Sequence, residues 1–133
     1  MPEPSNPISS YLDTGERFYT STEIRDFYNL LKENGTFQSH ADAFMASIAL
    51  GISHEKFEPL VHRVDLMILA VYRSADPNGI FPLLVKVLHP ELDKTALARR
   101  MEEYAIYGAK LLMEQHEKLG KIDFDLFHAL AKA

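Results

Sequence analysis

The chain has 133 residues, a net charge of −5 from 14 basic and 19 acidic side chains, and no cysteine. The length is that of one domain able to bury its own core, and the lack of thiols excludes disulfides, thiolate zinc sites and a cysteine nucleophile. Binding to nucleic acid irrespective of its sequence requires a surplus of Lys and Arg, so the acidic balance argues against DNA as the sole partner.

The first 20 residues are predicted to form a flexible or extended N-terminal arm, ahead of one helical domain over residues 21–133. The opening MPEPSNPISS is rich in proline and serine and lacks the basic start and apolar core of a signal peptide. The segment YLDTGERFY that follows fits a short strand as well as an extended arm. No run approaches the ~20 apolar residues that cross a bilayer, and we expect a cytoplasmic protein.

The first predicted helix runs from about Thr22 to Asn34. Ser21 or Thr22 can cap its start, because a hydroxyl there accepts a hydrogen bond from a free backbone N–H, and Gly35 is expected to end it. Apolar residues at helical spacing give this helix one buried side and one side in water: Ile24, Phe27, Tyr28 and Leu31.

A second, almost wholly apolar helix is predicted between Ser39 and Gly51. Ser39 is the expected N-cap, Asp42 follows in a position like that of a capping box, and Gly51 is expected to stop the helix. A helix without a polar side belongs in the centre of a domain. The hydroxyl of Ser47 inside it is expected to bond a carbonyl one turn back.

The segment RVDLMILAVYRSA is predicted to be a third helix, also mostly apolar and closed by the turn sequence DPNG. Its carboxylate, Asp65, is expected to face water or to pair with Arg63 or Arg73, because an ionised carboxylate is costly to bury alone. A structural ion pair is favoured here over a catalytic acid.

The segment IFPLLVKVLH, residues 80–89, has the composition of a short buried strand as well as that of a helix. Pro82 lies where the first turn of a helix tolerates proline. The rest of the sequence offers no convincing strand to pair with it, so we predict a helix, with the strand left as the alternative.

The longest predicted element runs from about Lys94 to Leu119, opened by Asp93 or Thr95 and ended by Gly120. At ~1.5 Å per residue such a helix spans the width of a domain of this size. One side of it carries the apolar residues Leu97, Met101, Tyr104, Gly108, Leu111, Leu112 and Leu119.

A last helix is predicted over about Asp125 to Lys132, with Ile122 placed to pack against Phe127 at its start. Together the helical segments predict an all-α fold. We expect a compact single-domain bundle of about five to six helices with one long helix in the C-terminal half.

Residues able to carry catalysis or bind a metal are not arranged in a recognisable motif. HEKFE, from His54 to Glu58, lacks the second His four residues on that the zinc-protease pattern requires. Glu114 and His116 are two residues apart and so face different directions on a helix. The scattered glycines form no phosphate-binding loop. We therefore predict no catalytic, cofactor-binding or metal-binding residue, and a protein that is not an enzyme.

Lys94, Arg99 and Arg100 form the best basic cluster and are the candidate DNA-binding residues. Glu103 lies four residues after Arg99 and three after Arg100, which is the spacing of ordinary ion pairs on a helix surface. The run of Lys110, Glu114 and Lys118 continues the same pattern. This spacing favours an ion-paired, solvated surface over one that binds phosphates.

Ile106 and Met113 lie seven residues apart and point away from the main apolar side of the long helix, with Tyr107 beside them. An exposed apolar strip of this kind marks either a contact with the last helix or an interface with another chain. In the second case these three residues are the interface anchors, and a two-fold helix-to-helix dimer is the simplest geometry.

Two blocks, GTFQSHADAFMASIALGISHEKFEPL and RRMEEYAIYGAKLLMEQ, resemble a family of small helical proteins encoded beside bacterial and archaeal DNA phosphorothioation (Dnd) systems. The resemblance covers about a third of the chain. It departs from the family's basic stretch at ISHEKFEPL, which has one Lys against two Glu, so it does not imply a DNA contact there. The matching residues are Phe37, Asp42, Ala43, Phe44, Ala49, Leu50, Gly51, Pro59 and Leu60, then Glu102, Glu103, Tyr104, Ala105 and Gly108.

The resemblance implies an accessory protein of a prokaryotic DNA-modification or anti-phage defence system. We expect it to be non-enzymatic and to act through protein–protein contacts, as a homo-oligomer, most simply a dimer, or as the partner of a larger complex. The alternatives are a dimeric DNA-binding or regulatory protein, in which Arg99 and Arg100 of both copies form one basic groove, and a soluble helical protein of another role.

Overall fold

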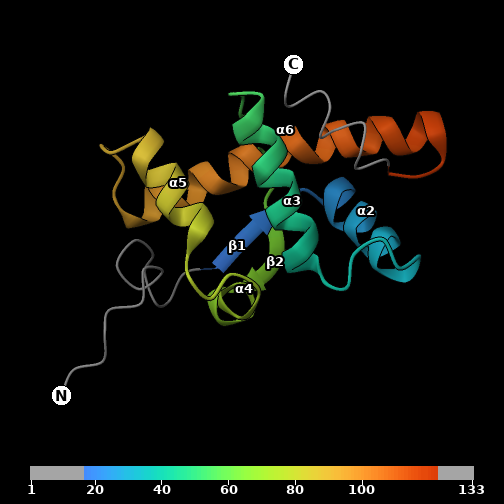
Figure 1. Cartoon of the computed structure of the whole chain (residues 1–133), viewed down its shortest axis with the longest axis horizontal. Coiled ribbons are helices and arrows are strands. Elements are labelled where there is room, and N and C mark those ends of the chain that lie inside the picture. The colour runs from blue at the N-terminus through green and yellow to red at the C-terminus, as the bar shows by residue number, and fades with distance from the viewer. Residues whose placement is uncertain (1–16, 123–133) are drawn as a thin grey trace.

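A computed structural model describes residues 17–122 of the chain. The described part holds five helices and one two-stranded antiparallel sheet. Figure 1 shows their order in the chain: β1 (Arg17–Thr20), α2 (Thr22–Glu33), α3 (His40–Ser53), β2 (Val64–Ile68), α4 (Leu69–Ala75), α5 (Ile80–Leu88) and α6 (Lys94–Leu119).

The long helix α6 runs along the longest axis of the molecule, and α3 crosses it (Figure 1). These two helices form the most extensive contact between elements. In the same view α5 lies over the N-terminal half of α6, and α2 lies towards its other end. None of the helices described here combines the length and apolar character that crossing a membrane requires.

The sheet makes the all-α prediction correct only in part. β1 confirms the short strand that was one of the two alternatives for YLDTGERFY, and β2 occupies the first half of the predicted third helix, of which only α4 is helical. The two strands pair antiparallel, with Phe18 opposite Met67, although they lie about fifty residues apart in the chain. The pairing gives backbone N–H and C=O groups of both segments hydrogen-bond partners. That distant pairing outweighs the apolar pattern that favoured a helix.

Asp65 therefore lies on a strand and faces water, which was one of the predicted outcomes, whereas its partner is Arg17 and not Arg63 or Arg73. Its carboxylate accepts a hydrogen bond from Arg17 Nε on the neighbouring strand at 3.3 Å. Both side chains are exposed, so this pair is a surface contact across the sheet and contributes little to stability.

The predicted bounds of α2 and α6 are confirmed to within a residue. Ser21 caps α2 by accepting a hydrogen bond from the Ile24 N–H at 3.2 Å. Asp93 caps α6 through the Ala96 N–H at 2.8 Å, and Gly120 ends α6 in the left-handed conformation with φ 72°. Local side-chain chemistry sets these three ends.

The helix predicted over residues 80–89 is also confirmed, as α5. Its first turn is organised by the buried Asp76, whose carboxylate accepts hydrogen bonds from the Ile80 N–H at 2.9 Å and the Phe81 N–H at 3.2 Å. Asp76 also accepts the hydroxyl of the buried Tyr72 at 2.7 Å. The turn DPNG thus supplies the cap of the helix that follows it.

Gly51 does not stop α3, which continues to Ser53. A Cβ added at Gly51 would lie 2.3 Å from the backbone oxygen of Tyr104, and one at Gly108 would lie 1.8 Å from that of Ser47. Both glycines are therefore present because the backbones of α3 and α6 approach each other closely, and not to end a helix. Contact with α6 keeps α3 helical beyond Gly51.

Polar groups inside this core are satisfied. Ser47 donates to the Ala43 carbonyl one turn back at 2.8 Å, as predicted, and accepts the hydroxyl of Tyr28 at 2.7 Å. Ile122 packs against the core, whereas its predicted partner Phe127 and the helix over Asp125 to Lys132 lie outside the described residues.

Candidate functional site

A cleft of about 450 Å³ opens where the loop after α3 and the end of α5 meet α6. One part of its lining is apolar and the other part is polar, the mixture that binding sites for small groups usually show. The lining residues are Ile52, Phe57 and Leu88 on the apolar side and Glu55, His89 and Tyr104 on the polar side.

The loop after α3 and the end of α5 each supply both apolar and polar residues to the lining. The loop after α3 turns at Glu55, which has φ 55° and is the single non-glycine residue at positive φ in the described range. This conformation costs roughly 1–2 kcal/mol for an L residue. The loop is tied to α6 by the Glu58 N–H, which donates to the Glu103 carbonyl at 3.1 Å. His89 ends α5 through its own N–H, bonded to the Val85 carbonyl at 2.8 Å.

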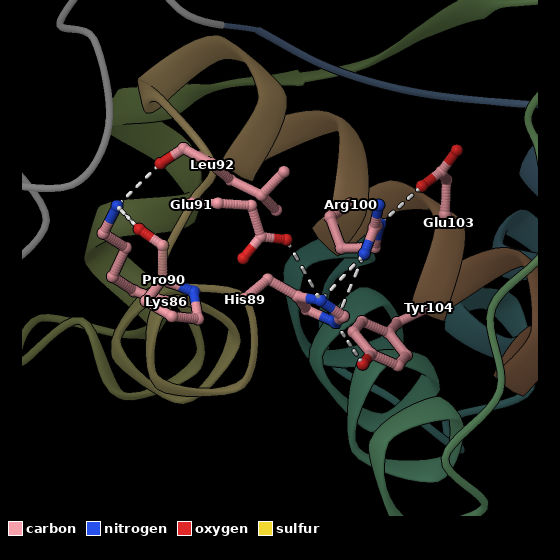
Figure 2. A network of polar contacts seen from close by, with 8 residues as sticks. All are labelled: Lys86, His89, Pro90, Glu91, Leu92, Arg100, Glu103 and Tyr104. Atoms are coloured by element: carbon pink, nitrogen blue, oxygen red, sulfur yellow. Dashed lines mark hydrogen bonds and ion pairs between the residues drawn. The ribbon is translucent and has the colours of Figure 1, made fainter.

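Figure 2 shows a chain of hydrogen bonds that leads to the cleft. Arg100 Nη1 lies 3.0 Å from His89 Nδ1, the shorter of its two contacts with the ring, and His89 Nε2 lies 2.7 Å from the Tyr104 hydroxyl. A guanidinium only donates, so Nδ1 accepts and the proton of a neutral imidazole is on Nε2, which donates to Tyr104. Glu103 completes the network by accepting from Arg100 Nε at 2.9 Å.

The charges around the cleft follow from this network. Burial, and then the Arg100 guanidinium, lower the pKa of His89, which keeps the imidazole neutral at neutral pH. Burial raises the pKa of Tyr104, so that its hydroxyl stays protonated. The site therefore presents a phenol and the Glu55 carboxylate to a ligand, an arrangement suited to binding.

The ring of Phe57 supports these groups from the loop. The Arg100 guanidinium lies 4.1 Å from the Phe57 ring centroid, a cation–π contact. The same ring meets His89 edge-on at 5.8 Å and Tyr104 at 5.3 Å between centroids. Phe57 is nonetheless 42% exposed, so part of its surface remains available at the cleft.

A second feature is the outer surface of α5, which adjoins the cleft at Leu88. Pro82 and Val85 are the buried residues of this nine-residue helix, and five apolar side chains remain exposed. Its lysine, Lys86, donates to the carbonyls of Pro90 at 2.8 Å and Leu92 at 2.6 Å, which holds its charge against the following loop (Figure 2). We call the exposed residues the α5 face: Ile80, Leu83, Leu84, Val87 and Leu88.

The residues predicted as interface anchors are not arranged as an exposed strip. Ile106 is buried, at 4% exposure, and Met113 is half-buried against the core. Tyr107 lies under the Lys56 ammonium, 5.8 Å from its ring centroid. α6 contacts α2, α3, α5 and β1, so more than one of its sides is covered. Ile106 is therefore not exposed as an interface anchor, and the alternative, a contact of the strip with the last predicted helix, lies outside the described residues.

The candidate DNA-binding residues are not gathered on one surface. Arg100 bonds His89 behind the lining of the cleft, and Lys94 is exposed at the start of α6. Arg99 donates to the Arg17 carbonyl at 2.7 Å and pairs with Glu102 at 3.1 Å. The ion pair of Arg100 with Glu103 is the one that the spacing predicted. DNA binding itself stays a prediction.

The other predicted surface pairs are found in part. Lys118 pairs with Glu114 at 2.8 Å, whereas Lys110 pairs with Glu58 in the loop after α3. Across residues 17–122 no three His, Asp or Glu side chains are grouped so as to hold a metal ion.

Sequence reasoning missed the cleft because its polar residues come from three separate segments. Glu55 and Phe57 fall within HEKFE, which matches no metal-binding pattern, and the spacing of His89 and Tyr104 gives no local motif. Comparison with known proteins found no family model, curated protein or solved structure that matches the chain.

Proposed function

We propose that this chain is a non-enzymatic accessory protein that acts through protein–protein contacts, and that two copies associate through the α5 face. The observation that carries the proposal is the exposure of apolar side chains along α5, with Val87 at 68% and Leu88 at 51%. An apolar surface of this kind costs free energy in water and is a common mark of an interaction site.

The chemistry of the α5 face favours a second copy of the chain as its occupant. Its five residues carry no charge, and Lys86 is held by backbone carbonyls. A surface without charge matches itself across a two-fold axis, because no like charges are brought together. The net charge of −5 therefore does not oppose the contact directly. α5 is ~14 Å long at ~1.5 Å per residue, enough for two antiparallel copies to interdigitate.

The cellular setting of the proposal comes from the two sequence blocks. Their resemblance to small helical proteins encoded beside DNA phosphorothioation systems supports a role in a prokaryotic DNA-modification or anti-phage defence system. In such a role the chain would join or stabilise a larger assembly and leave the chemistry to other subunits.

Light scattering on three proteins tests the proposal: the wild type, Leu84→Asp and the control Leu30→Asp. Leu84 on α5 is 42% exposed and Leu30 on α2 is 41% exposed, so the two substitutions add the same charge at matched burial. We expect the wild type and Leu30→Asp at twice 15.1 kDa and Leu84→Asp at 15.1 kDa with an unchanged helical circular dichroism spectrum. A wild type that is monomeric at millimolar concentration would contradict the proposal.

A further inference from the structure

We propose that the cleft binds the guanidinium group of an arginine side chain supplied by a partner protein. This inference rests on the proposed function in that the chain acts through protein contacts, and it uses the cleft, which shares Leu88 with the α5 face. The cleft is formed by residues of the loop after α3, the end of α5 and α6. Its lining combines apolar and polar residues, and each kind matches one part of an arginine side chain.

The apolar residues of the lining match the aliphatic part of arginine. Ile52 and Leu88 line the cleft, and Leu88 is 51% exposed. The three methylene groups of an arginine side chain leave water when they lie along these residues, while its guanidinium stays beside the polar residues of the lining. Phe57 adds an aromatic surface on which a planar guanidinium stacks favourably.

The polar part of the lining includes the carboxylate of Glu55. Glu55 is the charged residue of the lining, and no hydrogen bond or ion pair joins its side chain to another residue of the described range. The left-handed backbone at Glu55 turns the chain at the edge of the cleft and away from the axis of α3. A carboxylate accepts the paired N–H groups of a guanidinium side by side, which a lysine ammonium does not match.

Tyr104 supplies the second polar contact. His89 donates to its oxygen at 2.7 Å, which leaves that oxygen a lone pair and the hydroxyl its own proton. Glu55 and Tyr104 both line the cleft, so the carboxylate and the phenol face the same space. A guanidinium has five N–H donors, enough for the carboxylate and the phenol together.

The charge balance at the cleft selects a cation over an anion. The positive charge of Arg100 is paired with Glu103, the pKa of His89 is lowered so that the ring is neutral, and Glu91 adds a carboxylate 3.9 Å from His89 Nδ1. Phosphate or carboxylate ligands would meet two acidic side chains and no unpaired cation among these residues. The net charge of −5 on the whole chain also attracts a basic partner over distance.

The test uses the full chain and two short peptides, acetyl-Ala-Arg-Ala-amide and the same peptide with citrulline in place of arginine. Citrulline keeps the shape and removes the charge. In two-dimensional amide NMR titrations we expect the arginine peptide to shift the signals of Glu55, Leu88 and Tyr104, with a Kd of the order of millimolar. We expect the citrulline peptide to bind about tenfold more weakly, because a charged hydrogen bond is lost.

Variants assign the binding to the cleft. Glu55→Gln keeps the size of the side chain and should weaken binding of the arginine peptide about tenfold. The control is Glu33→Gln, at an exposed position at the end of α2, which should leave binding unchanged. Shifts elsewhere only, equal binding of both peptides, or full binding by Glu55→Gln would each overturn the inference.

The titration is repeated on Leu84→Asp to separate this inference from the proposed dimer. A short peptide reaches the cleft of a monomer, so binding should be unchanged in that variant. Arginine binding without self-association would leave the cleft standing and remove the α5 dimer. A dimer that does not bind the arginine peptide would support the α5 dimer and overturn the inference about the cleft.

Discussion

Two ion pairs lie one residue apart on α6 with the same three-residue spacing, yet their surroundings differ. Arg99 Nε is 3.1 Å from Glu102, whose side chain is 1% exposed, and Arg100 Nε is 2.9 Å from Glu103, whose side chain is 27% exposed. One step along a helix turns the side chain by about 100°. Arg99 therefore faces β1, and Arg100 faces His89 in the wall of the cleft (Figure 2).

The difference lies in what else each carboxylate holds. Glu102 also accepts the backbone N–H of Tyr19 at 2.7 Å, so it joins the strand β1 to α6 from a buried position. Glu103 instead neutralises Arg100, which in turn bonds His89. A buried charge must be fully paired to be tolerated, whereas a half-exposed pair leaves room for a ligand beside it. Identical spacing in the sequence thus serves structure in one pair and the candidate site in the other.

The largest expected effect comes from disturbing the close contact between α3 and α6, the helix that carries both pairs. In Gly108→Ala the added Cβ would lie 1.8 Å from the Ser47 carbonyl oxygen, which is backbone and cannot move aside. We expect a loss of about 3 kcal/mol in the free energy of unfolding, even after the better helix propensity of alanine. Urea unfolding followed by circular dichroism measures it.

A matched control is Gly120, the C-cap that follows α6. At Gly120 nothing lies within 4 Å of an added Cβ, and the cost comes only from φ 72°. Gly120→Ala should therefore lose about 1 kcal/mol. Equal losses in the two variants would show that α3 and α6 do not approach as closely as the structure has them.

The next prediction compares the two pairs directly. Glu102→Gln removes a buried charge opposite Arg99, and Glu103→Gln removes a half-exposed charge opposite Arg100. We expect a loss of about 2 kcal/mol for the first, discounted because Arg99 is partly exposed, and of about 0.5 kcal/mol for the second. Urea unfolding at pH 7 measures the two losses in the free energy of unfolding. A larger loss for Glu103→Gln would show that Glu103, and not Glu102, is the more important carboxylate for stability.

The parts of this fold that the sequence predicts are those set locally. Ser21, Asp93 and Gly120 mark helix ends because their own side chains, or the lack of one, satisfy the neighbouring backbone. The sheet escaped prediction because β2 is apolar enough for a helix and becomes a strand only by pairing with β1. No pattern within either segment records that partner.

Glycine and the cleft show the same limit. A glycine such as Gly51 can end a helix or can allow another backbone to approach closely. Only the position of Tyr104 in space shows that the second explanation is the right one. The site residues Glu55, His89 and Tyr104 likewise come together only when α3, α5 and α6 pack. The spacing of Arg100 and Glu103 predicted their pairing correctly but not that the pair borders a cleft.

The smallest expected effect is a pH dependence confined to the Arg100–Glu103 side. Burial and Arg100 lower the pKa of His89 in the folded chain, and Glu91 and Glu103 oppose that shift. Below the unfolded value of about 6.5 the unfolded chain therefore binds a proton that folded His89 does not, until the pH falls through the folded pKa. Stability from this group is complete above about pH 6.5 and declines as the pH falls.

Replacing the imidazole should remove this dependence. The gap in unfolding free energy between the wild type and His89→Gln should shrink by about 0.5 kcal/mol between pH 7.5 and pH 5.5. The pKa of His40 is also lowered, by burial and by Lys32 and Arg25, but His40 is present in both proteins, so its contribution cancels in the difference. A gap that stays constant would mean that His89 binds its proton equally in both states. The bond from Arg100 to Nδ1 would then not hold the ring neutral.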